Sequence, residues 1–202
     1  MEPESRPAPG YPAPFAVDAQ DTITNWRPLV QWLLAIPHFI VLYALGILSQ
    51  VVAVVAWFVI LFTGKLPEGL AGVQHLYVRY ANRTYAYAGF LREEYPPFTF
   101  DTTAEDPGDY PAVRTAFTPS YEDRNRLTVA FRFILVIPHL IVLSVLALVA
   151  YLLVLVNVVV VLVTGSWSAG MRDFVVGTLR WATRVNAYQL LLTDEYPPFS
   201  LD

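Results

Sequence analysis

The side chains whose types and spacing could perform chemistry are two histidines and two pairs of arginines. They are His38, His139, Arg79, Arg83, Arg180 and Arg184. Facing histidines can ligate haem or a metal ion, or can relay protons. Paired arginines can hold an anionic group, such as a phosphate, through several donors at once. The histidines are therefore candidates for metal or proton chemistry, and the arginines are candidates for anion binding.

Each histidine directly follows a proline within a stretch that has no formal charge. His38 lies in Ile-Pro-His-Phe-Ile-Val-Leu, and His139 lies in Ile-Pro-His-Leu-Ile-Val-Leu. Neither stretch contains a carboxylate that could orient an imidazole or accept its proton. We therefore expect each imidazole to bond the backbone carbonyl that proline leaves free, or to lie near a membrane interface. We predict no cofactor and no metal ion.

Arg79 and Arg83 are four residues apart, as are Arg180 and Arg184, so each pair lies on one face of a helix. An arginine at the centre of a bilayer costs on the order of 2.5–3.5 kcal/mol on insertion scales. We therefore expect each pair on an amphipathic interfacial helix, with apolar groups in the lipid and guanidinium groups against lipid phosphates. The sharper hypothesis is a site for one specific anionic headgroup.

These residues recur because the chain is built from two copies that are 101 positions apart. Pro37 corresponds to Pro138 and Gly64 to Gly165, and the run Glu-Tyr-Pro-Pro-Phe occurs at 94–98 and at 195–199. In each copy an apolar stretch ends in Thr-Gly, and glycine suits a helix C-terminus. A second helix follows, at about 70–91 and 171–192, and we expect the Pro-Pro pair to stop it.

Two stretches without Asp, Glu, Lys or Arg, residues 28–64 and 133–171, dominate the two copies. A charge-free apolar run of this length is typical of a membrane-embedded segment. Each is longer than one span of about 20 residues but shorter than two spans with a turn. One interpretation is a single tilted helix, kinked at Pro37 or Pro138.

The other interpretation is a tight helical hairpin, with its apex near residues 46–50 and 147–151. Single crossings would put the two arginine pairs on opposite sides of the membrane. Hairpins leave all 13 basic and 17 acidic residues on one side, which the positive-inside tendency makes cytoplasmic. Charge placement therefore favours hairpins, which could be shallow and re-entrant.

The predicted fold is mainly α and integral to a membrane. It has two tandem units, each with a kinked apolar helix or short helical hairpin followed by an amphipathic, arginine-bearing interfacial helix. The predicted organisation is a disordered proline-rich tail (1–14), repeat unit 1 (15–101), a linker (102–118) and repeat unit 2 (119–202). Within unit 1, residues 15–18 are a short extended candidate.

Composition narrows the function further. The 202 residues are 55% hydrophobic and only 15% charged, against about 25% charged in an average soluble domain. A net charge of −4 argues against nucleic-acid binding, which needs a basic face. The lack of cysteine excludes disulfides, thiolate metal sites and cysteine nucleophiles. Hydrolase, P-loop and zinc-protease motifs are also missing, which weakens an enzymatic interpretation.

The order Ile-Pro-His, Thr-Gly, Arg-Trp-x-x-Arg-x-x-Ala-Tyr and Tyr-Pro-Pro-Phe resembles a bacterial tandem-repeat membrane family of unknown function, DUF4389. The second copy fits this order best, from Arg180 to Tyr188, whereas the first has Tyr80 in the place of Trp181. The resemblance implies membrane residence and tandem units. It brings no assigned catalytic or binding residues.

Our leading hypothesis is a non-enzymatic integral membrane protein, an accessory or scaffold component of a bacterial cytoplasmic membrane that contacts anionic lipid. We expect a multi-pass protein with most charged residues in the cytoplasm. Its expected partners are the bilayer and either a membrane protein or further copies of itself, with no nucleic acid. The alternatives are a small oligomeric transporter or channel, and a haem- or metal-binding membrane protein that uses its paired histidines.

Overall fold

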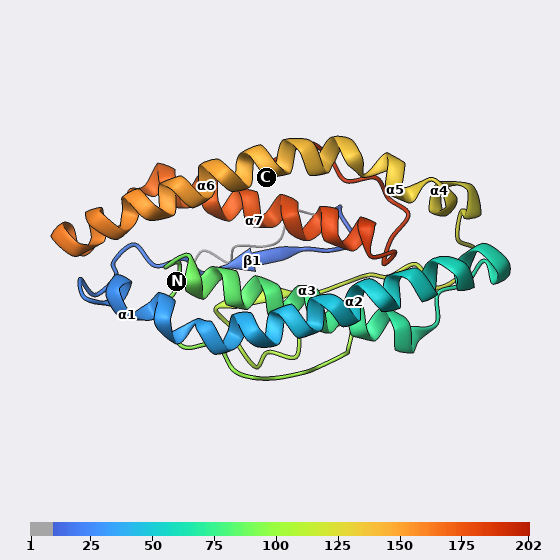
Figure 1. Cartoon of the computed structure of the whole chain (residues 1–202), viewed down its shortest axis with the longest axis horizontal. Coiled ribbons are helices and arrows are strands. Elements are labelled where there is room, and N and C mark those ends of the chain that lie inside the picture. Colours follow the sequence, from blue (N-terminus) through green and yellow to red (C-terminus); the bar gives the residue numbers. More distant parts are fainter. Residues whose placement is uncertain (1–9) are drawn as a thin grey trace.

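The computed structural model describes residues 10–202 and is mainly helical, with two tandem units (Figure 1). The first unit contains β1 (Phe15–Val17), α1 (Arg27–Leu34), α2 (Ile36–Thr63) and α3 (Glu68–Ala88). The rest of the chain contains β2 (Val113–Thr115), α4 (Arg126–Ala130), α5 (Arg132–Leu135), α6 (Ile137–Thr164) and α7 (Ala169–Gln189). The predicted short extended segment is β1.

Each apolar stretch forms one long helix, so the hairpin that charge placement favoured is wrong. Helices α2 and α6 have 28 residues each, which is about 42 Å at 1.5 Å per residue. The helical hydrogen bonding continues without a break through both proposed apices. Gly46 does not interrupt it. The kinked-helix interpretation is correct, because α1 ends just before Pro37 and α5 just before Pro138. Gly64 and Gly165 end α2 and α6 with φ of 73° and 69°.

The two units are related by an approximate two-fold axis that passes between α3 and α7. Figure 1 shows α2 and α6 running in opposite directions along the two long edges, with α3 and α7 between them. The Thr183 hydroxyl donates a hydrogen bond of 3.0 Å to the Asn82 side-chain oxygen. These residues are 101 positions apart and are therefore counterparts. Counterparts can touch only where the axis passes, so this bond lies close to it.

Each unit's lead-in segment closes the helical turn of the other unit. The Ile23 N–H donates to the Gly165 carbonyl oxygen (2.8 Å), and the Trp167 N–H donates to that of Asp21 (3.0 Å). The second lead-in repeats the pattern, and its bonds run from the Arg124 N–H to the Gly64 carbonyl (3.0 Å) and from the Leu66 N–H to the Tyr121 carbonyl (2.7 Å). The two units are therefore interlocked.

The segments expected to be a free tail and a linker are packed against the helices. Residues 1–9 of the predicted tail lie outside the described residues. In residues 10–14, Ala13 is 1% exposed and the Tyr11 hydroxyl donates to the carbonyl oxygens of Arg184 (3.2 Å) and Glu195 (3.1 Å). Strand β2, within the predicted linker 102–118, pairs antiparallel with β1. These contacts could not be predicted from the proline-rich composition, because hydroxyl and backbone groups make them.

The second helices end at Ala88 and Gln189, several residues before the Pro-Pro pairs, so the prediction that proline stops them is wrong. The stop comes from Phe90 (φ 59°) and Leu191 (φ 67°), which adopt the left-handed conformation. The next residue then donates its N–H back into the last turn, as in a Schellman motif, from Leu91 to Ala86 and from Leu192 to Ala187. Burial of both side chains offsets the strain of that conformation.

The linker also covers a buried histidine, and this histidine should make the stability of the fold depend on pH. The His75 imidazole is 1% exposed, donates from Nδ1 to the Thr102 carbonyl oxygen at 3.2 Å, and stacks on Phe117 with ring centroids 4.7 Å apart. Burial lowers the pKa of His75 from 6.5 to about 4. The folded protein therefore keeps this ring neutral where the unfolded chain binds a proton.

We expect the free energy of unfolding to fall as pH is lowered from 6.5 to 4, by up to about 3 kcal/mol from this group. His75→Val introduces the residue that unit 2 has at the equivalent position, Val176. This variant should make the free energy of unfolding depend less on pH. Chemical denaturation of the detergent-solubilised protein at several pH values measures this difference. Equal slopes in the wild type and the variant would contradict it.

Candidate functional site

The arginine pair of α3 is buried in a network supplied by the segment that follows the helix. Arg79 is 3% exposed, and its Nη1 lies 3.1 Å from Asp101 Oδ1. Its other donors reach the carbonyl oxygens of Thr103 (3.0 Å), Glu105 (2.8 Å) and Thr115 (3.3 Å). The segment 101–115 therefore folds around this guanidinium group.

Arg83 is bound in the same way by a second carboxylate. It is 2% exposed, and its Nη1 and Nη2 lie 3.1 and 3.5 Å from the two carboxylate oxygens of Asp109. The Thr99 hydroxyl accepts from Arg83 and donates to Asp109. Burial raises the pKa of Asp109, but the hydrogen bonds from Thr99 and Arg83 outweigh it and hold that pKa below its usual value.

The ion pairs of Arg79 and Arg83 compete with the expected contact between these arginines and lipid phosphates. A phosphate could reach Arg79 or Arg83 only by displacing Asp101 or Asp109 from a bond already made. The acceptors of these two arginines are therefore side chains and carbonyls of the protein itself. Helix α3 is correspondingly a core helix and not an interfacial one, because most of its residues are buried.

The equivalent pair on α7 has fewer partners. Arg180 donates from Nη1 to the Leu201 carbonyl oxygen at 3.0 Å, and Arg184 donates to the Ser200 carbonyl oxygen. Arg184 is 7% exposed. Within residues 10–202, no carboxylate oxygen lies within 4 Å of either guanidinium group. Headgroup binding by this pair stays a prediction.

Each histidine lies in an aromatic box closed by the Tyr-Pro-Pro-Phe run of its own unit. His38 is fully buried, its Nδ1 lies 2.8 Å from the Tyr80 hydroxyl, and its ring stacks on Phe98 with centroids 4.1 Å apart. His139 accepts from Trp181 Nε1 at 3.2 Å and stacks on Phe199 at 3.9 Å. The imidazoles thus bond a side chain of the second helix and not the backbone carbonyl that we expected.

The structure does not bring His38 and His139 together. The rings around His38 all belong to unit 1, and those around His139 all belong to unit 2. In the described part of the chain, no three His, Asp or Glu side chains gather in a way that could hold a metal ion. The paired-histidine hypothesis therefore lacks the facing geometry that it requires.

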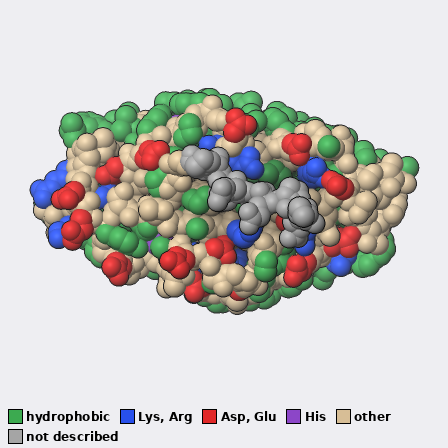
Figure 2. Space-filling view, turned by 180° about the vertical axis from the view of Figure 1, so that it is seen from behind, with side chains coloured by type: hydrophobic (Ala, Val, Ile, Leu, Met, Phe, Trp, Pro, Cys, Tyr) green, Lys and Arg blue, Asp and Glu red, His purple; other side chains and the backbone are tan. Residues whose placement is uncertain are grey.

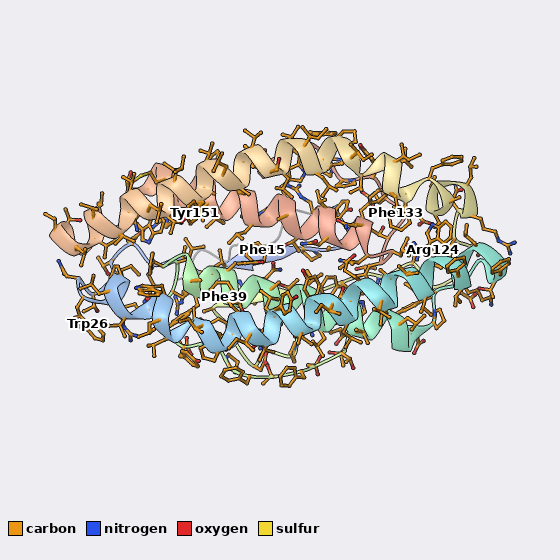
Figure 3. All side chains as sticks on the ribbon, viewed as in Figure 1. Phe15, Trp26, Phe39, Arg124, Phe133 and Tyr151 are labelled. Atoms are coloured by element: carbon orange, nitrogen blue, oxygen red, sulfur yellow. The ribbon has the colours of Figure 1, made fainter. Side chains whose placement is uncertain are left out.

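Sequence reasoning missed a third charged cluster, where α4 and α5 meet the end of α7. Arg124 and Arg132 are 4% and 1% exposed, and both bind Asp194 Oδ1, at 2.6 and 2.5 Å. Figure 3 labels Arg124 beside the end of α2, at the opposite end of the molecule from Trp26. Burial raises the pKa of Asp194, but hydrogen bonds from Arg124 and Asn125 hold it below its usual value.

The equivalent position in unit 1 shows the structural role of this cluster. Gln31, the counterpart of Arg132, donates to the Tyr87 and Arg92 carbonyl oxygens. Arg132 donates to the equivalent carbonyls of Tyr188 and Thr193. In both units a polar side chain just before the long helix therefore fastens it to the end of the second helix. A lone polar residue at the same place in both copies was the available signal.

We expect Asp194→Ala to destabilise the protein by about 3–5 kcal/mol, because two buried guanidinium groups lose their counter-charge. The matched control is Glu122→Ala, which removes the exposed ion pair with Lys65 and should leave the stability almost unchanged, because water screens that pair. Denaturant unfolding in detergent measures both variants. Equal losses would show that the Asp194 cluster is no more important than a surface pair.

Comparison with known proteins agrees with the duplication. The family described as "Domain of unknown function (DUF4389)" matches residues 25–99 and again residues 126–200, two regions 101 positions apart. No curated protein and no solved structure matches the chain. The two matches cover most of the sequence and include both histidine boxes and both arginine pairs. The chain belongs to the DUF4389 family, as two tandem copies of its domain.

Proposed function

We propose that the protein is a non-enzymatic, structural component of the bacterial cytoplasmic membrane that lies flat in one leaflet, held there by α2 and α6. The supporting observation is that both helices are apolar and exposed from one end to the other. Exposed side chains along α2 include Ile40 (66%), Val51 (57%) and Phe62 (78%). Those along α6 include Ile141 (61%), Leu152 (51%) and Val163 (77%). A water-soluble protein rarely exposes so continuous an apolar surface.

Two helical stretches, Arg27–Thr63 and Arg132–Thr164, are long and apolar enough to cross a membrane. The charges favour a flat orientation instead. Figure 2 shows acidic and basic side chains over the whole length of one broad face, with hydrophobic side chains gathered along the two long edges. If the long axis stood upright, that charged face would lie in hydrocarbon, at a cost of several kcal/mol for each charge.

The dimensions support the same orientation. A helix with its side chains is about 10–12 Å across, which fits within one leaflet of a hydrocarbon core about 30 Å thick. Figure 3 shows the side chains of Phe39, Tyr151 and Phe133 on the helices of the two edges. In this orientation both apolar helices enter one leaflet, and the charged face stays in water on the cytoplasmic side, as the positive-inside tendency favours.

The second candidate is a small oligomeric transporter or channel whose α2 and α6 span the bilayer. The observation in its favour is that α2 and α6 run in opposite directions and are each about 42 Å long, which exceeds the hydrocarbon thickness. Further copies would then have to cover the charged face. The lack of charged side chains within α2 and α6 argues against an ion path along them.

Spin labels on single introduced cysteines distinguish the two orientations, because the chain has no cysteine of its own. Ile40→Cys, Val51→Cys and Phe62→Cys are spaced by 11 residues, or about three turns, so they share one face of α2. In liposomes, a flat protein should give all three labels nearly the same immersion depth, as measured by accessibility to oxygen and to a polar relaxant.

The control label is Glu105→Cys, on an exposed residue of the linker, and it should be fully accessible to the polar relaxant. A spanning α2 would give a different profile, with Val51→Cys deepest and the two end positions shallow. That profile would replace the flat arrangement with the transporter or channel candidate. Equal and full accessibility of all four labels would contradict both.

A further inference from the structure

A groove of about 470 Å³ lies between α2 and α3, on the exposed side of unit 1. Four of the residues that line it are aromatic, namely Phe39, Tyr43, Tyr77 and Tyr85. The rings of Phe39 and Tyr85 meet across the two helices, with centroids 6.4 Å apart. The volume is within the range of small-molecule sites. Aromatic walls also favour a flat, unsaturated ring over a saturated acyl chain.

The groove contains hydrogen-bond donors that have no partner in the described part of the chain. The hydroxyl groups of Tyr43, Tyr77 and Tyr85 make no hydrogen bond to residues 10–202. Burial raises the pKa of Tyr77 and of Tyr85, and the neighbouring Tyr77 phenol raises that of Tyr85 further, so both hydroxyls keep their protons at pH 7. A ligand with hydrogen-bond acceptors would satisfy these donors.

The donors lie on both walls of the groove and are spread along its length. Tyr77 and Tyr85 are eight residues apart on α3, or about two turns, so they share one face of the helix. Tyr43 and Gln50 are seven residues apart on α2, also about two turns, and both line the groove. No Asp, Glu, Lys or Arg side chain of the described residues lines it. The groove therefore suits an uncharged molecule with acceptors on opposite edges.

The duplication supplies an internal comparison for this groove. The unit 2 counterparts of its four aromatic residues are Leu140, Ser144, Thr178 and Asn186. None of them is aromatic, so unit 2 lacks the flat walls that unit 1 has. Ala147 also stands in the place of Gly46, which lines the groove in unit 1. We therefore expect one site in each chain and not two.

We propose that this groove binds the ring of an isoprenoid quinone, a membrane-soluble molecule with a planar ring and carbonyl oxygens on opposite edges. The tyrosine hydroxyls and the Gln50 amide donate to these oxygens, and the aromatic walls pack on the ring. The apolar tail lies along exposed side chains of α2 such as Ile40 and Val51. The inference rests on the proposed function in one respect. Helix α2 must face lipid, because hydrocarbon has no water to satisfy the hydroxyl groups and the quinone enters from the bilayer.

Titration calorimetry of a decyl-benzoquinone into the detergent-purified full chain, at a fixed detergent concentration, tests the site. We expect saturable binding of one quinone per chain. Tyr77→Phe and Tyr85→Phe each keep the ring and remove one donor, so each should weaken binding by about three- to tenfold. Tyr151→Phe alters an exposed tyrosine of α6, at the position equivalent to Gln50, and should leave the affinity unchanged.

A second pair of variants tests the shape of the groove. Gly46→Leu should fill it and abolish binding. Gly46→Ala introduces the residue that unit 2 has at this position and should keep binding, because a Cβ atom there would lie 3.6 Å from the Tyr77 ring, an ordinary contact.

Uptake that does not saturate, or that is equal in the wild type, Gly46→Leu and the double variant Tyr77→Phe/Tyr85→Phe, would overturn the proposal. So would displacement of the quinone by an equal concentration of dioleoylglycerol, which would assign the groove to glycerolipid. Orientation in a bilayer does not affect a titration in detergent. These outcomes are therefore independent of the spin-label depths, which test the proposed function separately.

Discussion

The arrangement of the molecule depends on the backbone hydrogen bonds that each lead-in segment makes with the opposite unit. A glycine in the left-handed conformation ends each long helix and leaves polar backbone groups at the turn. The lead-in segment of the other unit forms hydrogen bonds with these groups. The Ile23 N–H donates to the Gly165 carbonyl, and the Arg124 N–H donates to the Gly64 carbonyl. These bonds fix where α2 and α6 lie relative to one another. The axis marked by Asn82 and Thr183 follows from that placement.

Buried guanidinium groups impose the second constraint. Burying a cation is favourable only when a counter-charge or several hydrogen-bond acceptors accompany it, and the segments that follow the helices supply most of these. Residues 101–115 wrap around Arg79 and Arg83, whereas Asp194 holds Arg124 and Arg132. The segments between the helices are consequently part of the core, although their composition is that of a linker. Among the described residues, the two units bind their equivalent arginines differently: carboxylates bind Arg79 and Arg83, whereas backbone carbonyls bind Arg180 and Arg184.

Much of the fold could be predicted from local patterns. The duplication, the two apolar stretches, the kinks before Pro37 and Pro138 and the glycine ends of the long helices all follow from neighbouring residues. The burial of Arg79 does not, because its partners lie more than 20 residues away and include backbone carbonyls. Periodicity gives the face on which an arginine lies but not what covers that face. The box around His38 was hidden for the same reason, since Phe98 is 60 positions distant.

The exchanged lead-ins carry a consequence for the origin of the chain. In each unit, the segment that completes the helical turn comes from the other copy, so one unit alone leaves its own turn open and its lead-in unused. A single-copy chain could meet both needs by exchanging those segments with an identical chain across a two-fold axis. Fusion of two such genes would preserve the same contacts within one polypeptide.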